Sequence, residues 1–183
     1  NKHETPILAE ASRALAIEWF EKGNEAPLLL KSNFISSVHR HIPLDLVVVP
    51  IRDGKKVSGL SIHAGLWTSS ALNSPPDDVP GLRTRLADLQ KKFGFDPKGH
   101  SGKALRHAVA SLPRDLVIAV GYDELRDLVM MAMSLADRPR PALLQVRSIL
   151  KAQLFTFVWL PREELTTARR TAIAMLLEAE VGR

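Results

Sequence analysis

Apolar positions near the start of the chain repeat with a helical period. Between residues 5 and 24 they recur three and four apart, which is typical of a helix with one buried face. Thr5 is suited to cap this helix, Pro6 to its first position, and Gly23 or Asn24 to its end. The pattern predicts that the buried face comprises Leu8, Ala11, Leu15 and Trp19.

Three segments with the pattern of strands follow, at residues 27–34, 44–51 and 55–66. Asp53 and Gly54 separate the last two segments, and Asp-Gly between apolar alternations predicts a hairpin because glycine accepts a positive φ. Alternation along the third strand predicts one polar face and one face toward a core. Val57, Gly59, Ser61 and His63 fall on the polar face, and Leu60, Ile62 and Ala64 on the core face.

Prolines between residues 75 and 80 interrupt any continuous helix and predict a boundary there. Three helical segments follow: residues 78–94 end at a glycine, residues 101–112 begin with Ser101 as a cap, and residues 122–137 stop before Pro139. In the third of these, Leu125, Leu128, Val129 and Ala132 form one buried stripe. Met130, Met131 and Met133 are interpreted as core residues rather than as a flexible binding face.

The end of the chain reads as a second hairpin and a last helix. Residues 142–148 and 152–160 alternate like two strands, and residues 166–180 have a helical period with Thr166 or Thr167 as the cap. Strands and helices therefore come in separate runs, which predicts an α+β protein with antiparallel sheet.

Composition narrows the classes of function. The chain has 183 residues with 45% hydrophobic and 25% charged residues, it contains no cysteine, and its formal charge is +5. No apolar run approaches the roughly 20 residues that span a membrane. The positive charge is spread out rather than gathered in a block, so a nucleic-acid partner is not expected. The absence of cysteine is compatible with the cytoplasm, which is the expected location.

Searches for catalytic motifs find no constellation. The stretch 99–104 (GHSGKA) resembles a phosphate-binding loop, but Pro97 stands where the first glycine belongs and Ala104 where magnesium needs a hydroxyl. Neither the dinucleotide pattern G-x-G-x-x-G nor the G-x-S-x-G elbow occurs, and the six histidines have no zinc-site spacing. No catalytic residue, cofactor or metal is therefore predicted within this chain.

Four stretches taken together, 28–51, 63–105, 112–125 and 154–170, resemble the amino-terminal region of the large bacterial NAD-dependent glutamate dehydrogenases. The family text runs K-[AS]-N-x-R-S-x-V-H-R, then G-L-[FW]-T-S-x-A-Y, S-H-x-G-K-A-L, P-R-D-E-L-F and V-P-R-[DE]. The chain departs from it in several places. The stretch IPLDL lacks both aromatic residues of the family's Y-x-D-Y, and ALN stands where the family has A-Y. Further along, PRDLVIA replaces PRDELF, and RSILKA lacks the glycine of the second hairpin turn.

The resemblance implies a regulatory and assembly region rather than a complete enzyme. In this family a separate domain binds NAD and deaminates glutamate to 2-oxoglutarate, so NAD belongs to the parent protein. The resemblance further implies a PAS-like module at residues 1–78, a helical segment at 79–139 and a partial ACT-like unit at 140–183. An amino-acid effector, pairing with other domains of the parent and a homo-oligomer are expected from it. The alternative is a free-standing module that senses an amino acid.

The SVHR stretch suggests the candidate ligand residues Lys31, His39 and Arg40. In one interpretation these cations form a patch for a carboxylate, since arginine offers a planar bidentate fork. In the other, His39 and Arg40 hydrogen-bond across the sheet or tie it to the helical segment.

Overall fold

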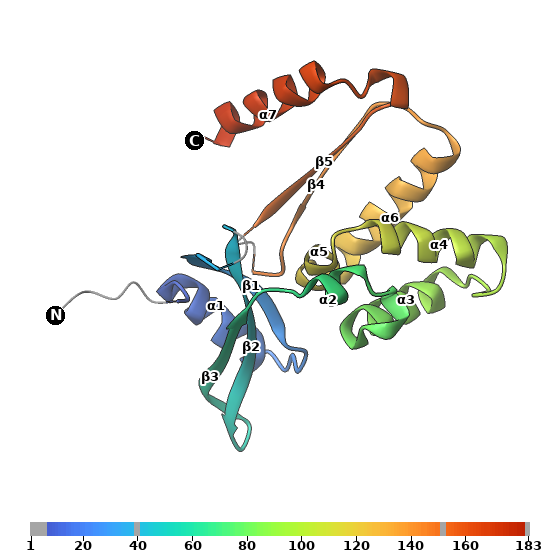
Figure 1. Cartoon of the computed structure of the whole chain (residues 1–183). Helices are drawn as coiled ribbons and strands as arrows, with labels where there is room; N and C mark the ends of the chain where they lie inside the picture. The colour runs from blue at the N-terminus through green and yellow to red at the C-terminus, as the bar shows by residue number, and fades with distance from the viewer. Residues whose placement is uncertain (1–6, 39–40, 151–152, 182–183) are drawn as a thin grey trace.

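The computed structural model describes residues 7–38, 41–150 and 153–181. Within these ranges a three-stranded antiparallel sheet comes first, a group of helices follows, and a two-stranded hairpin leads to the last helix (Figure 1). The predicted α+β class is confirmed. In Figure 1 the hairpin rises away from the helices, and the last helix lies at its far end.

The first sheet has the order β1-β2-β3, formed by β1 (Leu28–Ile35), β2 (Pro43–Asp53) and β3 (Lys56–Gly65). Asp53 pairs with Lys56 across a tight turn, and Gly54 in that turn has a φ of 60°. Because only glycine adopts this conformation without a Cβ clash, the predicted hairpin forms where the Asp-Gly signal places it.

A bulge in β3 corrects the predicted faces of this strand. Arg52 pairs with Val57, but Ile51 pairs with Gly59, so that Ser58 is an extra residue on β3. The extra residue reverses the alternation. Val57 is therefore buried with the apolar cluster against which Leu60 and Ile62 pack, rather than lying on the polar face, while His63 is exposed as predicted.

The first helix, α1 (Glu10–Glu21), is confirmed, but it begins later than predicted and its predicted buried face is only half correct. Leu8 is buried and Trp19 packs against the same core, as predicted. Ala16 and Phe20 are fully buried, whereas Leu15 is 43% exposed and Ala11 is exposed. Leu8 precedes the helix, so it does not belong to the helical stripe that Ala16 and Phe20 form. Gly23 follows the end of the helix with a φ of 91°, and Thr5 and Pro6 lie outside the described residues.

The helical group contains the three predicted helices as α3 (Pro80–Phe93), α4 (His100–Ser111) and α6 (Tyr122–Asp137). Gly94 ends α3 with a φ of 64°, as expected. Ser101 lies inside α4 rather than capping it, because the chain enters the helix at Gly99 without a side-chain cap. The short elements between and before them were not predicted; these are α2 (Ser69–Asn73), the 3₁₀ turn η1 (Pro76–Asp78) and α5 (Arg114–Ala119).

Long-range hydrogen bonds explain the helix α5, which has only six residues. Arg85 of α3 donates to the carbonyl oxygens of Val120 at 2.8 Å and Ile118 at 3.1 Å, which are among the unpaired carbonyls at the end of α5. Leu116 and Val117 of α5 are fully buried in the helical core. The helix is thus stabilised by its neighbours rather than by a local signal.

The helical core is confirmed along the stripe predicted for α6. Leu125, Leu128 and Val129 are fully buried and Ala132 packs against them. Met133 also packs against this core, but Met130 is 53% exposed, so the interpretation of the methionines as core residues fails at that position.

The second hairpin, β4 (Ala142–Arg147) with β5 (Leu154–Trp159), is confirmed and has two different faces. The inner face packs on the helical core through Leu144, Val146, Phe155, Phe157 and Trp159. The outer face leaves apolar side chains exposed at Leu143, Leu154 and Val158. A 3₁₀ turn η2 (Arg162–Glu164) then leads to α7 (Thr167–Val181), and the Thr166 hydroxyl accepts the Arg169 N–H at 3.2 Å, as predicted for its cap.

Candidate functional site

Lys31 lies on the middle of β1, where the register places it opposite Asp45 of β2. Its Nζ donates to Asp45 Oδ1 and lies 3.1 Å from Asp115 Oδ2 on α5. Asp45 is only 6% exposed. The lysine therefore joins two strands of the sheet to a helix of the helical group.

The environment of Lys31 favours the protonated, positively charged form of its side chain. Burial lowers the pKa of Lys31, but the hydrogen bond and charge of Asp45 and the charge of Asp115 outweigh burial and raise the pKa above its ordinary value. Two carboxylates share one ammonium, so a carboxylate ligand would have to displace at least one of them. The role of Lys31 in binding an effector stays a prediction.

His39 and Arg40 lie outside the described residues, so their predicted role also stays a prediction. The segment that leads to them is held locally. Ser36 Oγ accepts the Val38 N–H at 3.1 Å and lies 2.9 Å from the Val38 carbonyl oxygen, to which it donates.

A histidine and a serine meet on the outer face of the first sheet. His63 Nε2 lies 3.1 Å from Ser61 Oγ, and both residues are on β3. Nucleophilic catalysis also needs a group that orients the histidine. Within residues 7–38, 41–150 and 153–181 no carboxylate accepts a hydrogen bond from this ring. The described residues also contain no group of three side chains suited to a metal, and no helix there is long and apolar enough to cross a membrane.

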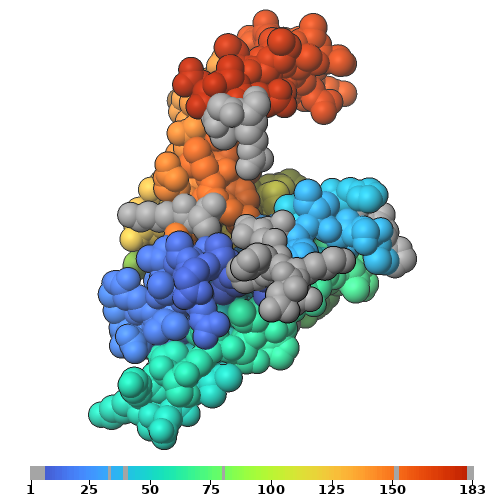
Figure 2. Space-filling model, turned by 90° about the vertical axis from the view of Figure 1, so that its left-hand side faces the viewer, coloured from blue at the N-terminus to red at the C-terminus, as the bar shows by residue number. Residues whose placement is uncertain are grey.

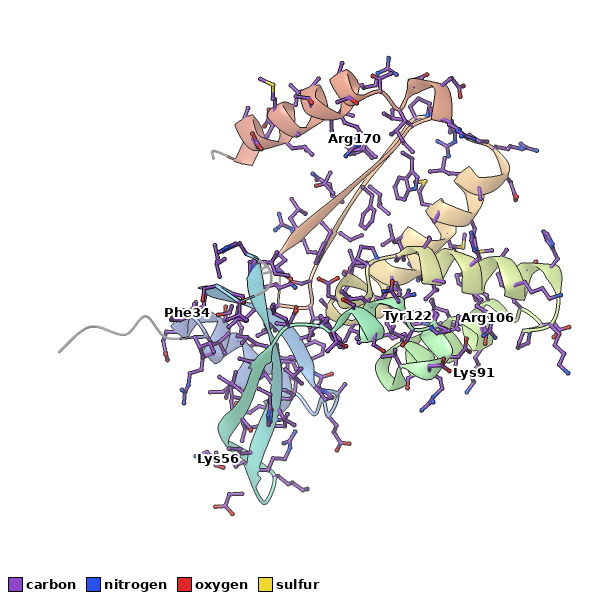
Figure 3. The ribbon with its side chains drawn as sticks, viewed as in Figure 1. Phe34, Lys56, Lys91, Arg106, Tyr122 and Arg170 are labelled. Atoms are coloured by element: carbon purple, nitrogen blue, oxygen red, sulfur yellow. The ribbon has the colours of Figure 1, made fainter. Side chains whose placement is uncertain are left out.

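A hollow lies where α1, α6 and the second hairpin meet. Its volume is about 540 Å³. Trp19 of α1, Gly121 and Glu124 at the start of α6, and Arg147 and Leu154 of the hairpin line it. Tyr122, labelled in Figure 3, is the first residue of α6.

Sequence reasoning missed this hollow, and no local signal marks it. Trp19, Glu124 and Arg147 belong to three distant segments of the chain, and each by itself reads as an ordinary surface or helix residue. The bridge between Val120 and Ser148, together with the bond from the Ile149 N–H to the Ala119 carbonyl at 2.9 Å, brings the hairpin to the start of α6.

Comparison with known proteins identifies relatives of the helical part and of most of the chain. Residues 79–138 match the family model described as glutamate dehydrogenase, helical motif 1. The chain resembles a segment of the NAD-specific glutamate dehydrogenases. This confirms the resemblance inferred from the sequence, and the matched range begins at the residue before α3 and ends just after α6.

Two curated relatives extend the similarity beyond the helices. The NAD-specific glutamate dehydrogenase of Pseudomonas aeruginosa is 30% identical over 155 residues, which cover 82% of this chain and 10% of that protein. The NAD-specific glutamate dehydrogenase of Halomonas elongata is 28% identical over 157 residues, covering 82% of this chain and 9% of that protein. The chain therefore spans about a tenth of the length of these relatives.

Proposed function

We propose that this chain is a non-catalytic regulatory and assembly region of a large NAD-dependent glutamate dehydrogenase. The parent protein would convert L-glutamate, NAD and water to 2-oxoglutarate, ammonia and NADH in the cytoplasm, and would bind NAD in another domain. The observation that carries the proposal is the similarity of 82% of this chain to about a tenth of two NAD-specific glutamate dehydrogenases. A PAS-like first module and a partial ACT-like last unit belong to the same proposal.

The exposed apolar surface at the end of the chain supports a role in assembly. The outer face of the hairpin exposes Leu143 and Val158, and α7 exposes Met175 and Leu176. Figure 2 shows α7, in red, projecting beyond the narrower hairpin region. A helix of 15 residues gains most of its stability from packing its apolar face. We therefore propose that this surface packs on another domain of the parent or on a second chain.

The first experiment compares NADH formation from glutamate by the isolated chain and by the parent protein. We expect the isolated chain to be inactive and the parent to be active. NADH formation by the isolated chain at the rate of the parent would overturn the proposal, and so would a parent that fails to oxidise glutamate.

A second experiment tests the assembly surface. Val158→Asp places a charge on the outer face of the hairpin, and we expect it to change the mass of the parent particle in light scattering, or to impair its folding, while the isolated chain keeps its helix content. Ala87→Asp adds the same charge at an exposed position of α3, away from this surface, and serves as the control. An unchanged, fully active parent with Val158→Asp would contradict the assembly role.

The alternative is a free-standing module that senses an amino acid, and the hollow beside Trp19 is the observation that favours it. The reading frame separates the two proposals. A frame that continues into a dinucleotide-binding domain supports the regulatory region, and a frame that ends after α7 supports the free-standing module.

A further inference from the structure

We propose that the hollow between α1, α6 and β4 binds a free α-amino acid with an apolar side chain. The hollow has the volume of an ordinary small-molecule site, at about 540 Å³. Its walls come from both hydrophobic cores, because Trp19 packs on the core of the first sheet and Val146 belongs to the helical core. A regulatory effect of this ligand rests on the function proposed above, whereas its binding is a property of this chain alone.

Two unpaired charges of opposite sign line the hollow. Neither Glu124 nor Arg147 takes part in an ion pair within the described ranges, although both contribute to the wall. The neighbouring Arg126, by contrast, is held by Asp123 at 2.8 Å and Asp127 at 2.7 Å. The hollow thus offers one free guanidinium and one free carboxylate, which suit a ligand that carries both charges.

Gly121 leaves room for the side chain of Glu124. Glu124 is the third residue of α6, and its carboxylate folds back over Gly121, where any Cβ would collide with it. This places the negative charge at the positive end of the helix dipole, which stabilises it there. An exposed carboxylate at this position can accept hydrogen bonds from the ammonium group of a ligand.

Arg147 provides the complementary anchor on the hairpin. It is the last residue of β4 and pairs in the ladder with Leu154, which also lines the hollow. A guanidinium binds a carboxylate through two parallel hydrogen bonds. The carboxylate of a zwitterion is therefore assigned to Arg147 and its ammonium to Glu124.

The remaining wall is largely apolar. Trp19, Val146, Ile149 and Leu154 contribute apolar surface to the hollow, and Gln145 and Ser148 are the other polar residues that line it. Such a wall favours an apolar or aromatic side chain over a second carboxylate. A nucleotide is disfavoured because one arginine is the only free cation among the residues that line the hollow.

The test titrates the chain by calorimetry with three matched probes. L-phenylalanine carries both charges, phenylpyruvate lacks the ammonium group, and 2-phenylethylamine lacks the carboxylate. We expect L-phenylalanine to bind and each analogue to bind at least about tenfold more weakly. Absence of binding by L-phenylalanine would overturn the proposal, and equal binding of phenylpyruvate would overturn the role of Glu124.

Two neutral variants test each anchor. Arg147→Gln should weaken the binding of L-phenylalanine and of phenylpyruvate but leave the binding of 2-phenylethylamine unchanged. Glu124→Gln should weaken the binding of L-phenylalanine and of 2-phenylethylamine but leave that of phenylpyruvate unchanged. Arg140→Gln and Glu163→Gln remove the same charges from exposed positions that do not line this hollow and should change nothing. Unchanged binding of L-phenylalanine to Arg147→Gln would overturn the assignment.

A second measurement applies if a variant fails to fold. Hydrogen exchange of the wild-type chain should slow at the start of α6 and at the end of β4 when L-phenylalanine binds, and protection elsewhere alone would overturn the site. The two proposals fail separately. A parent that oxidises glutamate while this chain ignores L-phenylalanine overturns only the site, and the reverse result overturns only the proposed parent activity.

Discussion

Gly102 lies in the first turn of α4, where the backbone of Asp96 and Pro97 crosses the helix. A Cβ at this position would collide with the Asp96 carbonyl oxygen and lie 2.8 Å from Pro97 Cα. The glycine in the GHSGK stretch is therefore explained by a close approach of two backbone segments, not by a phosphate loop.

We expect Gly102→Ala to destabilise the chain by about 1–3 kcal/mol, because the loop at Asp96 must move to admit the methyl group. Gly81→Ala in α3 is the matched control, since its Cβ would lie 3.7 Å from Ile118 Cδ1, an ordinary contact. The control should be neutral or stabilising by up to about 1 kcal/mol because alanine favours helix. Urea unfolding measures both, and equal effects would contradict the explanation.

The contribution of Lys31 to stability should depend on pH. Lys31→Met leaves Asp45 buried without its cation, and we expect a loss of about 1.5–3 kcal/mol in the free energy of unfolding near pH 8. The pKa of Lys31 is raised in the folded chain. Its stabilisation is therefore complete below the ordinary lysine pKa of about 10.4 and is lost as the pH rises through the higher folded value.

Urea unfolding of wild type and Lys31→Met at about pH 8 and about pH 11.5 checks this linkage. The difference between the two proteins should shrink at the higher pH. Lys22→Met is the control, because Lys22 forms an exposed ion pair with Glu18 and should have no measurable effect. A difference that grows with pH would contradict the assignment.

At the scale of elements, α1 shows how a period can be correct while its phase is wrong. Apolar residues recur on more than one side of this helix, and the sheet selects the side that carries Ala16 and Phe20. The bulge at Ser58 acts in the same way on β3, since it moves Val57 to the core. In both cases the partner element decides which face is buried.

We expect Phe20→Ala to cost about 3–5 kcal/mol, because it removes a fully buried ring from the first core. Leu15→Ala in the same helix should change the free energy of unfolding by no more than about 0.5 kcal/mol, since Leu15 is largely exposed. Guanidinium unfolding followed by circular dichroism compares them. A larger loss for Leu15→Ala would restore the face predicted from the sequence.

For the whole molecule, two hydrophobic cores are joined by a few contacts. One core contains α1 and the first sheet, and the other contains the helices and the inner face of the second hairpin. Leu150, at the turn of that hairpin, is buried in the first core at 8% exposure. The ion pair between Lys31 and Asp115 is a second link.

We expect Leu150→Ala to destabilise the chain by about 2–5 kcal/mol and to weaken the coupling between the two cores. Calorimetry should then show a broadened or divided transition, with the helical core melting last. Leu143→Ala, on the exposed face of the same hairpin, should leave a single transition near that of the wild type. A single sharp transition at lower temperature for Leu150→Ala would show that the cores unfold together.

Elements whose signals are local could be predicted from the sequence. The Asp-Gly turn before β3, the glycine that ends α3, the prolines that limit the helices and the threonine that caps α7 act through backbone conformation or a hydrogen bond within a few residues. The order of four short motifs was enough to indicate the family, because order and spacing survive where single residues change. The candidate residue Lys31 was found as a cation, but its two carboxylate partners were not.

Properties that depend on contacts between distant segments could not be predicted in this way, because they arise only when the chain folds. The buried side of α1, the partners of Lys31, the short helix α5 and the hollow lined by Trp19, Glu124 and Arg147 all depend on elements far apart in the chain. A sequence pattern carries the period of a helix or strand, but the phase and the neighbours are set by which surfaces bury the most apolar area together. The buried faces depend on the packing of the whole chain, so they cannot be predicted from a single stretch of sequence.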